Sequence, residues 1–263
     1  MNHSRIMLTP SDVSVLHLVE DCEMDMFTVP ELETLSGLGH RKLIESLSRL
    51  VSVGSLSRVE RGVYCTRNFR NINAIATRIV KDSAIAYWTA LNLHGMTEQI
   101  PNVVFVQSCN PKADKGIFGV RCKFVRVKKD AYTGIMQMGY GRESFNVTDR
   151  EKTLIDCFCL PGYSGGYAEL LRAFSAADPD AGKLLEYGKK VGNLSVLKRM
   201  AYLSELWEME GFDDFRSEVS RILNSKYSLL DPFGDNRGPF IDKWKIRSNI
   251  GKDDLDGIRE KIY

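Results

Sequence analysis

A histidine and a glutamate four positions apart are the first residues in this chain whose types and spacing suggest chemistry. His94 and Glu98 lie in the segment A-I-A-Y-W-T-A-L-N-L-H-G-M-T-E-Q-I-P, residues 84–101. On one helix this spacing would put both side chains on the same face, as an acid–base pair or two metal ligands would require. Gly95 lies between them, and glycine commonly ends a helix in the left-handed conformation. We therefore expect the helix to stop at His94, which removes the helical meaning of the spacing.

Other patterns do not indicate catalysis either. The loop G-Y-S-G-G (162–166) lacks the lysine of a P-loop and does not match G-x-G-x-x-G. The six cysteines include no C-x-x-C pair. The sequence therefore predicts a protein that is not an enzyme and that needs neither a metal nor a cofactor.

The composition is that of a globular protein of one or two domains. The chain has 263 residues, of which 43% are hydrophobic and 27% are charged. It contains no apolar run of about 18 residues, and its first ten residues do not resemble a signal peptide. We expect a cytoplasmic protein without a membrane partner.

The charge of the first seventy residues changes sign abruptly. Residues 1–39 contain one basic and seven acidic residues, whereas residues 40–70 contain seven basic and two acidic residues. A local excess of positive charge of this size indicates a face that binds a polyanion.

The same seventy residues predict a winged helix-turn-helix. Ser11 is expected to cap a first helix, and Thr28 with Glu31 forms a capping box for a second that ends near Ser36. A third helix is expected from about His40 to Val53, followed by two strands around a turn at residues 60–62. The apolar face of the third helix would contain Leu43, Ile44, Leu47, Leu50 and Val51.

This arrangement favours DNA binding. A recognition helix places its N-terminal residues against base edges, and a basic wing reaches phosphates or the minor groove. The predicted DNA contacts lie on the third helix and the wing: His40, Arg41, Lys42, Ser46, Arg49, Arg58 and Arg61. The alternative is a winged helix that contacts only protein.

Two domains are expected, residues 1–75 and residues 76–263, and together they give an α+β fold. The second is predicted to be a mixed α/β domain with a helix-rich second half and a possible helical subdomain from about residue 180. Its helices are expected to include one capped by Asp82 or Ser83, and one opened by a capping box from Thr148 to Glu151.

A predicted strand at residues 121–129 is unusually basic. It contains no acidic residue, and its cations are Arg121, Lys123, Arg126, Lys128 and Lys129. Charge on both faces is typical of an edge strand protected against aggregation. A second basic surface for nucleic acid or an acidic partner is the other interpretation.

Three segments resemble the AbiEi-type antitoxins of type IV toxin–antitoxin systems. They are the winged helix with its R-G-V-Y wing (61–64), Y-W-T-A-L-N-L-H-G-M-T-E-Q-I-P (87–101), and V-T-D-R-E-K-T-L-I-D (147–156). The segment K-W-K-I-R-S-N (243–249) is also similar to a family ending.

The resemblance implies a protein with two functions. It would repress its own operon at inverted repeats in double-stranded DNA, and it would counteract a nucleotidyltransferase-like toxin encoded in that operon. The family's DNA-contacting positions would correspond to the third helix and the wing, and no catalytic residue carries over. Direct contact with the toxin is left open. The alternative is a stand-alone winged-helix regulator whose C-terminal domain senses a ligand or oligomerises.

Overall fold

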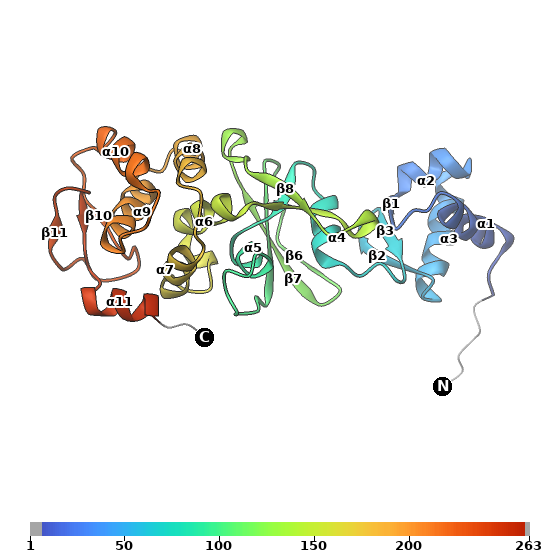
Figure 1. The fold of residues 1–263 in the computed structure, drawn as a ribbon. Coiled ribbons are helices and arrows are strands. Elements are labelled where there is room, and N and C mark those ends of the chain that lie inside the picture. Colours follow the sequence, from blue (N-terminus) through green and yellow to red (C-terminus); the bar gives the residue numbers. More distant parts are fainter. Residues whose placement is uncertain (1–6, 261–263) are drawn as a thin grey trace.

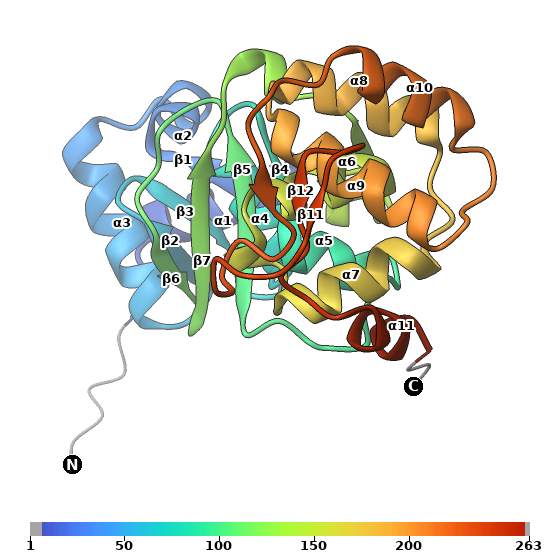
Figure 2. The ribbon, with the colours of Figure 1, turned by 90° about the vertical axis from the view of Figure 1, so that its left-hand side faces the viewer.

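The computed structural model describes residues 7–260 and shows a mixed α+β protein. It is elongated, with the N-terminal helices at one end, a six-stranded sheet in the middle and the C-terminal helices at the other end (Figure 1). Figure 2 looks along this axis from the C-terminal end. No helix within the described residues combines the length and apolarity that a membrane span needs.

The N-terminal unit consists of three helices and a small sheet around one apolar cluster. Its elements are α1 (Pro10–Asp21), β1 (Met26–Thr28), α2 (Val29–Ser36), α3 (His40–Ser52), β2 (Leu56–Glu60) and β3 (Val63–Thr66). The strand order is β1-β3-β2, and all pairs are antiparallel. Val15, Phe27 and Leu47 are among the fully buried side chains of its core.

The start of α1 corrects one expectation, because Thr9 and not Ser11 is the N-cap. The Thr9 hydroxyl accepts a hydrogen bond from the Asp12 amide, and the Asp12 carboxylate accepts one from the Thr9 amide at 2.8 Å. Pro10 is the first helical residue, where its missing N–H costs nothing. The capping box of Thr28 and Glu31 on α2 is confirmed.

The central sheet has the strand order β6-β7-β5-β4-β9-β8. Its strands are β4 (Ser83–Ile85), β5 (Val103–Ser108), β6 (Lys115–Ile117), β7 (Val120–Arg126), β8 (Ile135–Met138) and β9 (Phe145–Thr148). Two expectations were wrong. Residues 83–85 form an inner strand and not the start of a helix. The basic strand β7 lies between β6 and β5, so it is not an edge strand.

Helices cover the sheet through two apolar clusters. Helix α4 (Ile72–Arg78) packs on the sheet in a cluster that includes Ile75, Val106 and Val147. Helix α5 (Tyr87–Leu93) follows β4 directly, and its Tyr87 lies in a larger cluster that continues into the C-terminal helices.

The C-terminal half is mostly helical. It contains α6 (Arg150–Cys159), α7 (Tyr167–Ala176), α8 (Ala181–Val191), α9 (Leu194–Leu206), α10 (Asp213–Arg221) and α11 (Lys252–Glu260), with a small sheet of β10 (Ser228–Leu229), β12 (Ile246–Arg247) and β11 (Phe240–Ile241). Helix α6 is capped by Asp149, whereas Thr148 belongs to β9, so the predicted capping box is wrong.

A buried ion pair lies within α6. Lys152 and Asp156 are one helical turn apart, and their side chains are 0% and 5% exposed. The Lys152 ammonium donates to Oδ1 of Asp156, while Oδ2 has no hydrogen-bond partner among residues 7–260. Burial raises the pKa of Asp156 to about 6, against the opposing effect of the neighbouring ammonium.

The β6–β7 hairpin contacts the N-terminal unit at the tip of the β2–β3 hairpin. Both carboxylate oxygens of Glu60 accept from Lys112 at 2.8 Å, and one also accepts from Lys115 at 2.6 Å. The Arg70 guanidinium lies 4.4 Å from the centre of the Phe118 ring. The β2–β3 hairpin is therefore fastened to the sheet.

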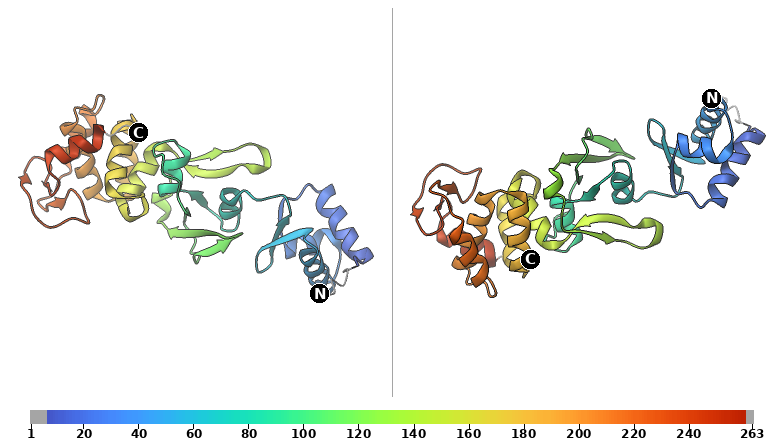
Figure 3. Two further views of the ribbon diagram at one scale, coloured as in Figure 1. Left: turned by 90° about the horizontal axis from the view of Figure 1, so that it is seen from below. Right: turned by 90° about the horizontal axis from the view of Figure 1, so that it is seen from above.

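The β8–β9 hairpin makes the second contact between these parts. At its tip, Arg142 forms ion pairs with Glu23 at 2.6 Å and Asp25 at 3.7 Å, both between α1 and β1. Asn71, the N-cap of α4, and Arg78, its last residue, donate to backbone carbonyls of the same tip. Figure 3 shows the two hairpins extending from the sheet on either side of α4, toward the N-terminal unit.

Candidate nucleic-acid interface

The N-terminal turn of α3 is exposed and carries cations, so a ligand could bind at this helix end. Leu43, Leu47 and Leu50 fix the opposite face, because all three are fully buried. Gly37 ends α2 with φ +64°, and Gly39 begins α3, so the two helices are joined by a tight turn. This geometry turns the first residues of α3 outward.

The first three residues of α3 differ in how free they are. The Arg41 side chain is 95% exposed, and its one ion-pair partner within residues 7–260 is Glu45, at 3.2 Å on its own helix. Lys42 is exposed. The His40 ring is 72% exposed but contacts the carboxylate of Glu33 on α2. Lys42 also lines a cleft with residues of α1 and α2. Within residues 7–260, Arg41 and Lys42 can therefore reach a phosphate or a base edge without breaking a hydrogen bond or ion pair to another helix.

Ser46 and Arg49 are not free on the exposed face of α3 as the sequence suggested, although Arg49 is still 32% exposed. Ser46 is fully buried. Arg49 forms a two-pronged ion pair with Asp12 of α1, with both N–O distances 2.9 Å. Their partner lies in another helix 37 residues earlier, which periodicity along α3 could not reveal. Ile44, predicted to be part of the apolar core, is 36% exposed.

The Asp12–Arg49 pair has a clear electrostatic consequence. Hydrogen bonding to the Arg49 guanidinium holds the pKa of Asp12 well below its usual range, although burial opposes the shift. The same contact raises the pKa of Arg49. The pair fastens α3 to α1 and so holds the exposed turn of α3 in place.

Arg58 and Arg61 of the β2–β3 hairpin are exposed. The turn predicted at residues 60–62 occupies residues 61 and 62, because Glu60 still belongs to β2. Between them stands Glu60, which the sequence reading treated only as a turn residue. Burial raises the pKa of Glu60, but bonds from Lys112 and Lys115 outweigh this and hold it below its usual value. The two lysines thus neutralise a carboxylate that would otherwise repel phosphate.

The basic residues of β7 and its continuation do not form one free surface. Arg121 and Lys123 both lie near the carboxylate of Asp114, at 3.9 and 3.4 Å. Lys123 also stands 5.1 Å from the centre of the Tyr163 ring. Arg126, Lys128 and Lys129 are exposed at the other end of the strand. The strand is therefore basic at both ends, with one acidic residue shared near its start.

Polar side chains of residues 84–101 form hydrogen bonds to other parts of the fold. Helix α5 ends at Leu93, His94 is its C-cap, and Gly95 has φ +68°, as expected from the sequence. The His94 ring contacts the Thr148 carbonyl oxygen at 2.6 Å, and the Thr97 hydroxyl donates to Glu169 at 2.6 Å. Glu98 lies beyond the helix end and is exposed. This segment joins the sheet to α7.

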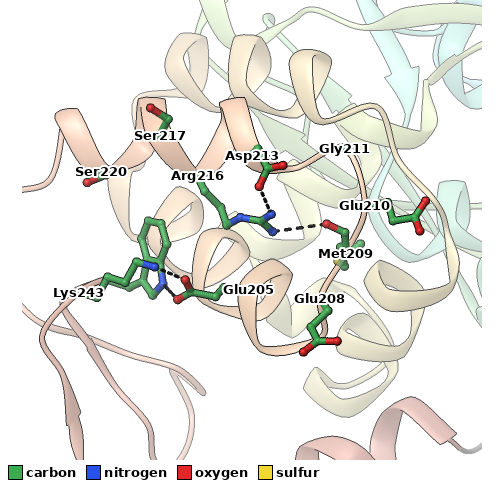
Figure 4. Close-up of a pocket in the computed structure, with 11 residues that line it drawn as sticks. Glu205, Glu208, Met209, Glu210, Gly211, Asp213, Arg216, Ser217, Ser220 and Lys243 are labelled. Atoms are coloured by element: carbon green, nitrogen blue, oxygen red, sulfur yellow. Dashed lines mark hydrogen bonds and ion pairs between the residues drawn. The ribbon is translucent and has the colours of Figure 1, made fainter.

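A cleft lies at the end of the molecule opposite α3, and Figure 4 shows the residues that line it. It has a volume of about 640 Å³ and is lined by the α9–α10 connection, α10 and residues 243–244. Arg216 binds Asp213 at 2.6 Å and the Met209 carbonyl, while Glu205 accepts from Lys243 and Trp244. No histidine or cysteine lines this cleft. Within residues 7–260, no group of His, Cys, Asp and Glu is placed to hold a metal ion.

The comparison with known families selects the N-terminal unit. Residues 23–67 match the family described as "Transcriptional regulator, AbiEi antitoxin". The match confirms the AbiEi resemblance seen in the sequence. This AbiEi-matched segment (residues 23–67) runs from just before β1 to the end of β3, and so includes α2, α3 and the β2–β3 hairpin.

A solved structure has a similar fold over nearly the whole chain. It is the crystal structure of the RV2827C protein from Mycobacterium tuberculosis, with a TM-score of 0.60 and 13% sequence identity. The similarity covers 91% of this chain and 92% of that one. No curated protein matches in sequence. The arrangement around the AbiEi-matched segment therefore occurs in a second protein with little sequence in common.

Proposed function

We propose that the protein is a DNA-binding transcriptional regulator whose residues 7–67 form a winged helix. In this proposal α3 is the recognition helix, and the β2–β3 hairpin is the wing. The observation that carries it is the exposed basic turn at the start of α3 within the AbiEi-matched segment. There, among residues 7–260, Arg41 and Lys42 form no ion pair with another helix. A helix N-terminus with cations suits both phosphates and base edges.

The set of proposed contacts is smaller than the sequence suggested. Arg41, Lys42, Arg58 and Arg61 remain, because all four are exposed. His40 stays a candidate at the helix start, although its ring would have to leave Glu33. Ser46 and Arg49 are removed from the set as residues that hold α3 in place.

A binding assay with the DNA upstream of the gene tests this assignment. Arg41→Ala with Arg61→Ala should weaken binding and reduce the slope of log K against log salt by about 0.9 for each lost phosphate contact. Arg237→Ala is the matched control, since its side chain is 78% exposed at the opposite end of the molecule. Unchanged affinity and slope in the double variant would refute the proposed interface.

We further propose that the regulator acts on its own operon and is the antitoxin of a nucleotidyltransferase-like toxin, in the manner of type IV systems. The family that residues 23–67 match is one of antitoxins as well as transcriptional regulators, which supports this role. The proposal includes no catalytic step, and the internal hydrogen bonds of His94 and Thr97 support a purely binding protein.

Co-expression with the neighbouring gene tests the antitoxin role. The Arg41→Ala, Arg61→Ala variant, supplied from a separate promoter, should still rescue growth, because neutralisation would not need the DNA-binding residues. If the neighbouring gene product is not toxic, the antitoxin role fails, and the alternative of a stand-alone regulator is favoured. Loss of rescue in the variant would show that neutralisation depends on DNA binding.

A further inference from the structure

One edge of the central sheet is open. Strand β8 is hydrogen-bonded to β9 on one side only, with Met136 opposite Val147 and Met138 opposite Phe145. Among residues 7–260, no other strand, loop or side chain is hydrogen-bonded to residues 135–138. An edge strand leaves half of its backbone N–H and C=O groups available to another strand.

This edge lacks the protection that exposed edges usually have. Residues 131–141 read A-Y-T-G-I-M-Q-M-G-Y-G, eleven residues without a charge, in a chain that is 27% charged. The opposite edge, β6, carries Lys115 and is covered where Lys115 binds Glu60 of the N-terminal unit. Charged side chains or a covering element are the usual means of preventing edge pairing, and β8 has neither.

The side chains at this edge are apolar and exposed. Met136 is 42% exposed, and Tyr140, at the hairpin tip, is 93% exposed. Met136 and Met138 share a face with the buried residues Val147 and Phe145, because directly opposite residues point the same way. The apolar face under α4 thus continues to the open edge and stops there.

We propose that β8 pairs antiparallel with β8 of a second copy of this chain. A two-fold axis at Gln137 would place Gln137 opposite its own copy, and Met136 opposite Met138 of the second copy. The four methionines would then extend the apolar face across the new seam, and the two glutamine amides would meet on the other face.

The second copy is the occupant that the charges favour. A strand paired antiparallel with itself brings each residue against a residue of the same segment, so a charge on the axis would face its own copy and one beside the axis would lie diagonally near its copy. Residues 131–141 contain no charge, and their pattern of methionines on either side of Gln137 is symmetric about the axis. A charged partner strand would find no complementary charge along this edge.

A charge-swap experiment tests the pairing in the absence of DNA. Gln137 is exposed, so Gln137→Lys and Gln137→Glu should fold normally. Each alone should raise the dissociation constant of the dimer at least about fivefold, because like charges then stand opposite each other. An equimolar mixture of the two variants should recover dimers. The matched control is Ile100→Lys, at a loop residue that is 84% exposed, which should dimerise as the wild type does.

Analytical ultracentrifugation gives the readout. A monomeric wild type at concentrations up to about 100 μM, or variants that dimerise equally well, would overturn the proposal. Growth into larger aggregates that Gln137→Lys prevents would show an open edge without the two-fold pairing, and this too would overturn it. Because no DNA or toxin is present, the result is independent of the proposed function.

Cysteine cross-linking tests the register. In a Cys22→Ser background, which removes a native exposed thiol, Gln137→Cys should form a disulfide-linked dimer on mild oxidation. Opposite residues of antiparallel strands have Cα atoms about 4.5–5.5 Å apart, within the range of a disulfide. Met136→Cys should cross-link far less, because its partner would be Met138. Equal cross-linking at both positions would contradict the proposed axis.

Discussion

Removing one member of the Lys152–Asp156 pair should destabilise the C-terminal half far more than removing both. In Lys152→Met the carboxylate of Asp156 stays in a site where its side chain is 5% exposed, and it loses the one side-chain donor that it has among residues 7–260. An unpaired charge in such a site typically costs about 3–5 kcal/mol of unfolding free energy. Replacing both residues, as in Lys152→Met with Asp156→Leu, should leave the stability within about 1 kcal/mol of the wild type or raise it.

The cost of Lys152→Met should also depend on pH. The pKa of Asp156 in the folded protein, about 6, lies above its ordinary value of 3.8, so the folded state holds this proton more tightly than the unfolded chain. The contribution of this tighter proton binding to the free energy of unfolding is fully present below about pH 4 and is lost as the pH rises through about 6. In the single variant the buried charge appears only when Asp156 ionises, so its cost should be largest at pH 8 and smaller at pH 5.

Urea denaturation followed by tryptophan fluorescence measures the loss of stability in the part of the molecule that contains α6. The three tryptophans are residues 88, 207 and 244, all outside the N-terminal unit. The double-mutant cycle then gives the interaction energy of the pair. A Lys152→Met variant within about 1 kcal/mol of the wild type at pH 8 would refute the reasoning, since the carboxylate would then have to be hydrated or neutral.

Three further outcomes follow from particular contacts. Asp12→Asn should make the stability of the N-terminal unit less sensitive to acid. The stabilisation from the lowered pKa of Asp12 exists at neutral pH and is lost as the pH falls below about 4. Thermal unfolding at pH 3 and pH 7 measures the difference between the variant and the wild type. Gly238→Ala should cost at least about 2 kcal/mol, since φ is +94° and its Cβ would lie 2.0 Å from a carbonyl oxygen, whereas Gly211→Ala, with φ +73° and open space, should cost only about 1 kcal/mol. Glu60→Gln should loosen the N-terminal unit from the sheet and speed proteolysis of the connection at residues 67–71. The control is Glu45→Gln, at an exposed position of α3. Equal cleavage rates in the two variants would count against the contact.

Local signals were enough for most helices. The capping box at Thr28 and Glu31, the glycine after Ser36 and the stop at Gly95 each act within one turn of a helix end, and each is present in the structure. These features depend on hydrogen bonds between near neighbours, which the order of residues expresses directly.

The errors have a common physical cause, which is partners distant in the sequence. Ser46 and Arg49 looked free because periodicity describes a helix against itself, whereas Asp12, which binds Arg49, lies on α1. Residues 83–85 looked helical because a three-residue strand is too short to show an alternating pattern. The basic residues of β7 suggested an edge, but the position of a strand in a sheet is fixed by its neighbours and not by its own composition.

The two hairpin contacts also bear on the order in which the chain can fold. The apolar cluster of the N-terminal unit closes with residues 15–64, so it can form while later segments are still being synthesised. The contacts of Glu60 with Lys112 and Lys115, 52 and 55 residues away, form only after those lysines are synthesised. The same holds for the ion pair of Glu23 with Arg142. Contacts over such separations form slowly, because long loops must close first. In a nascent chain, the basic turn of α3 would therefore be folded before the orientation of the N-terminal unit on the sheet is fixed.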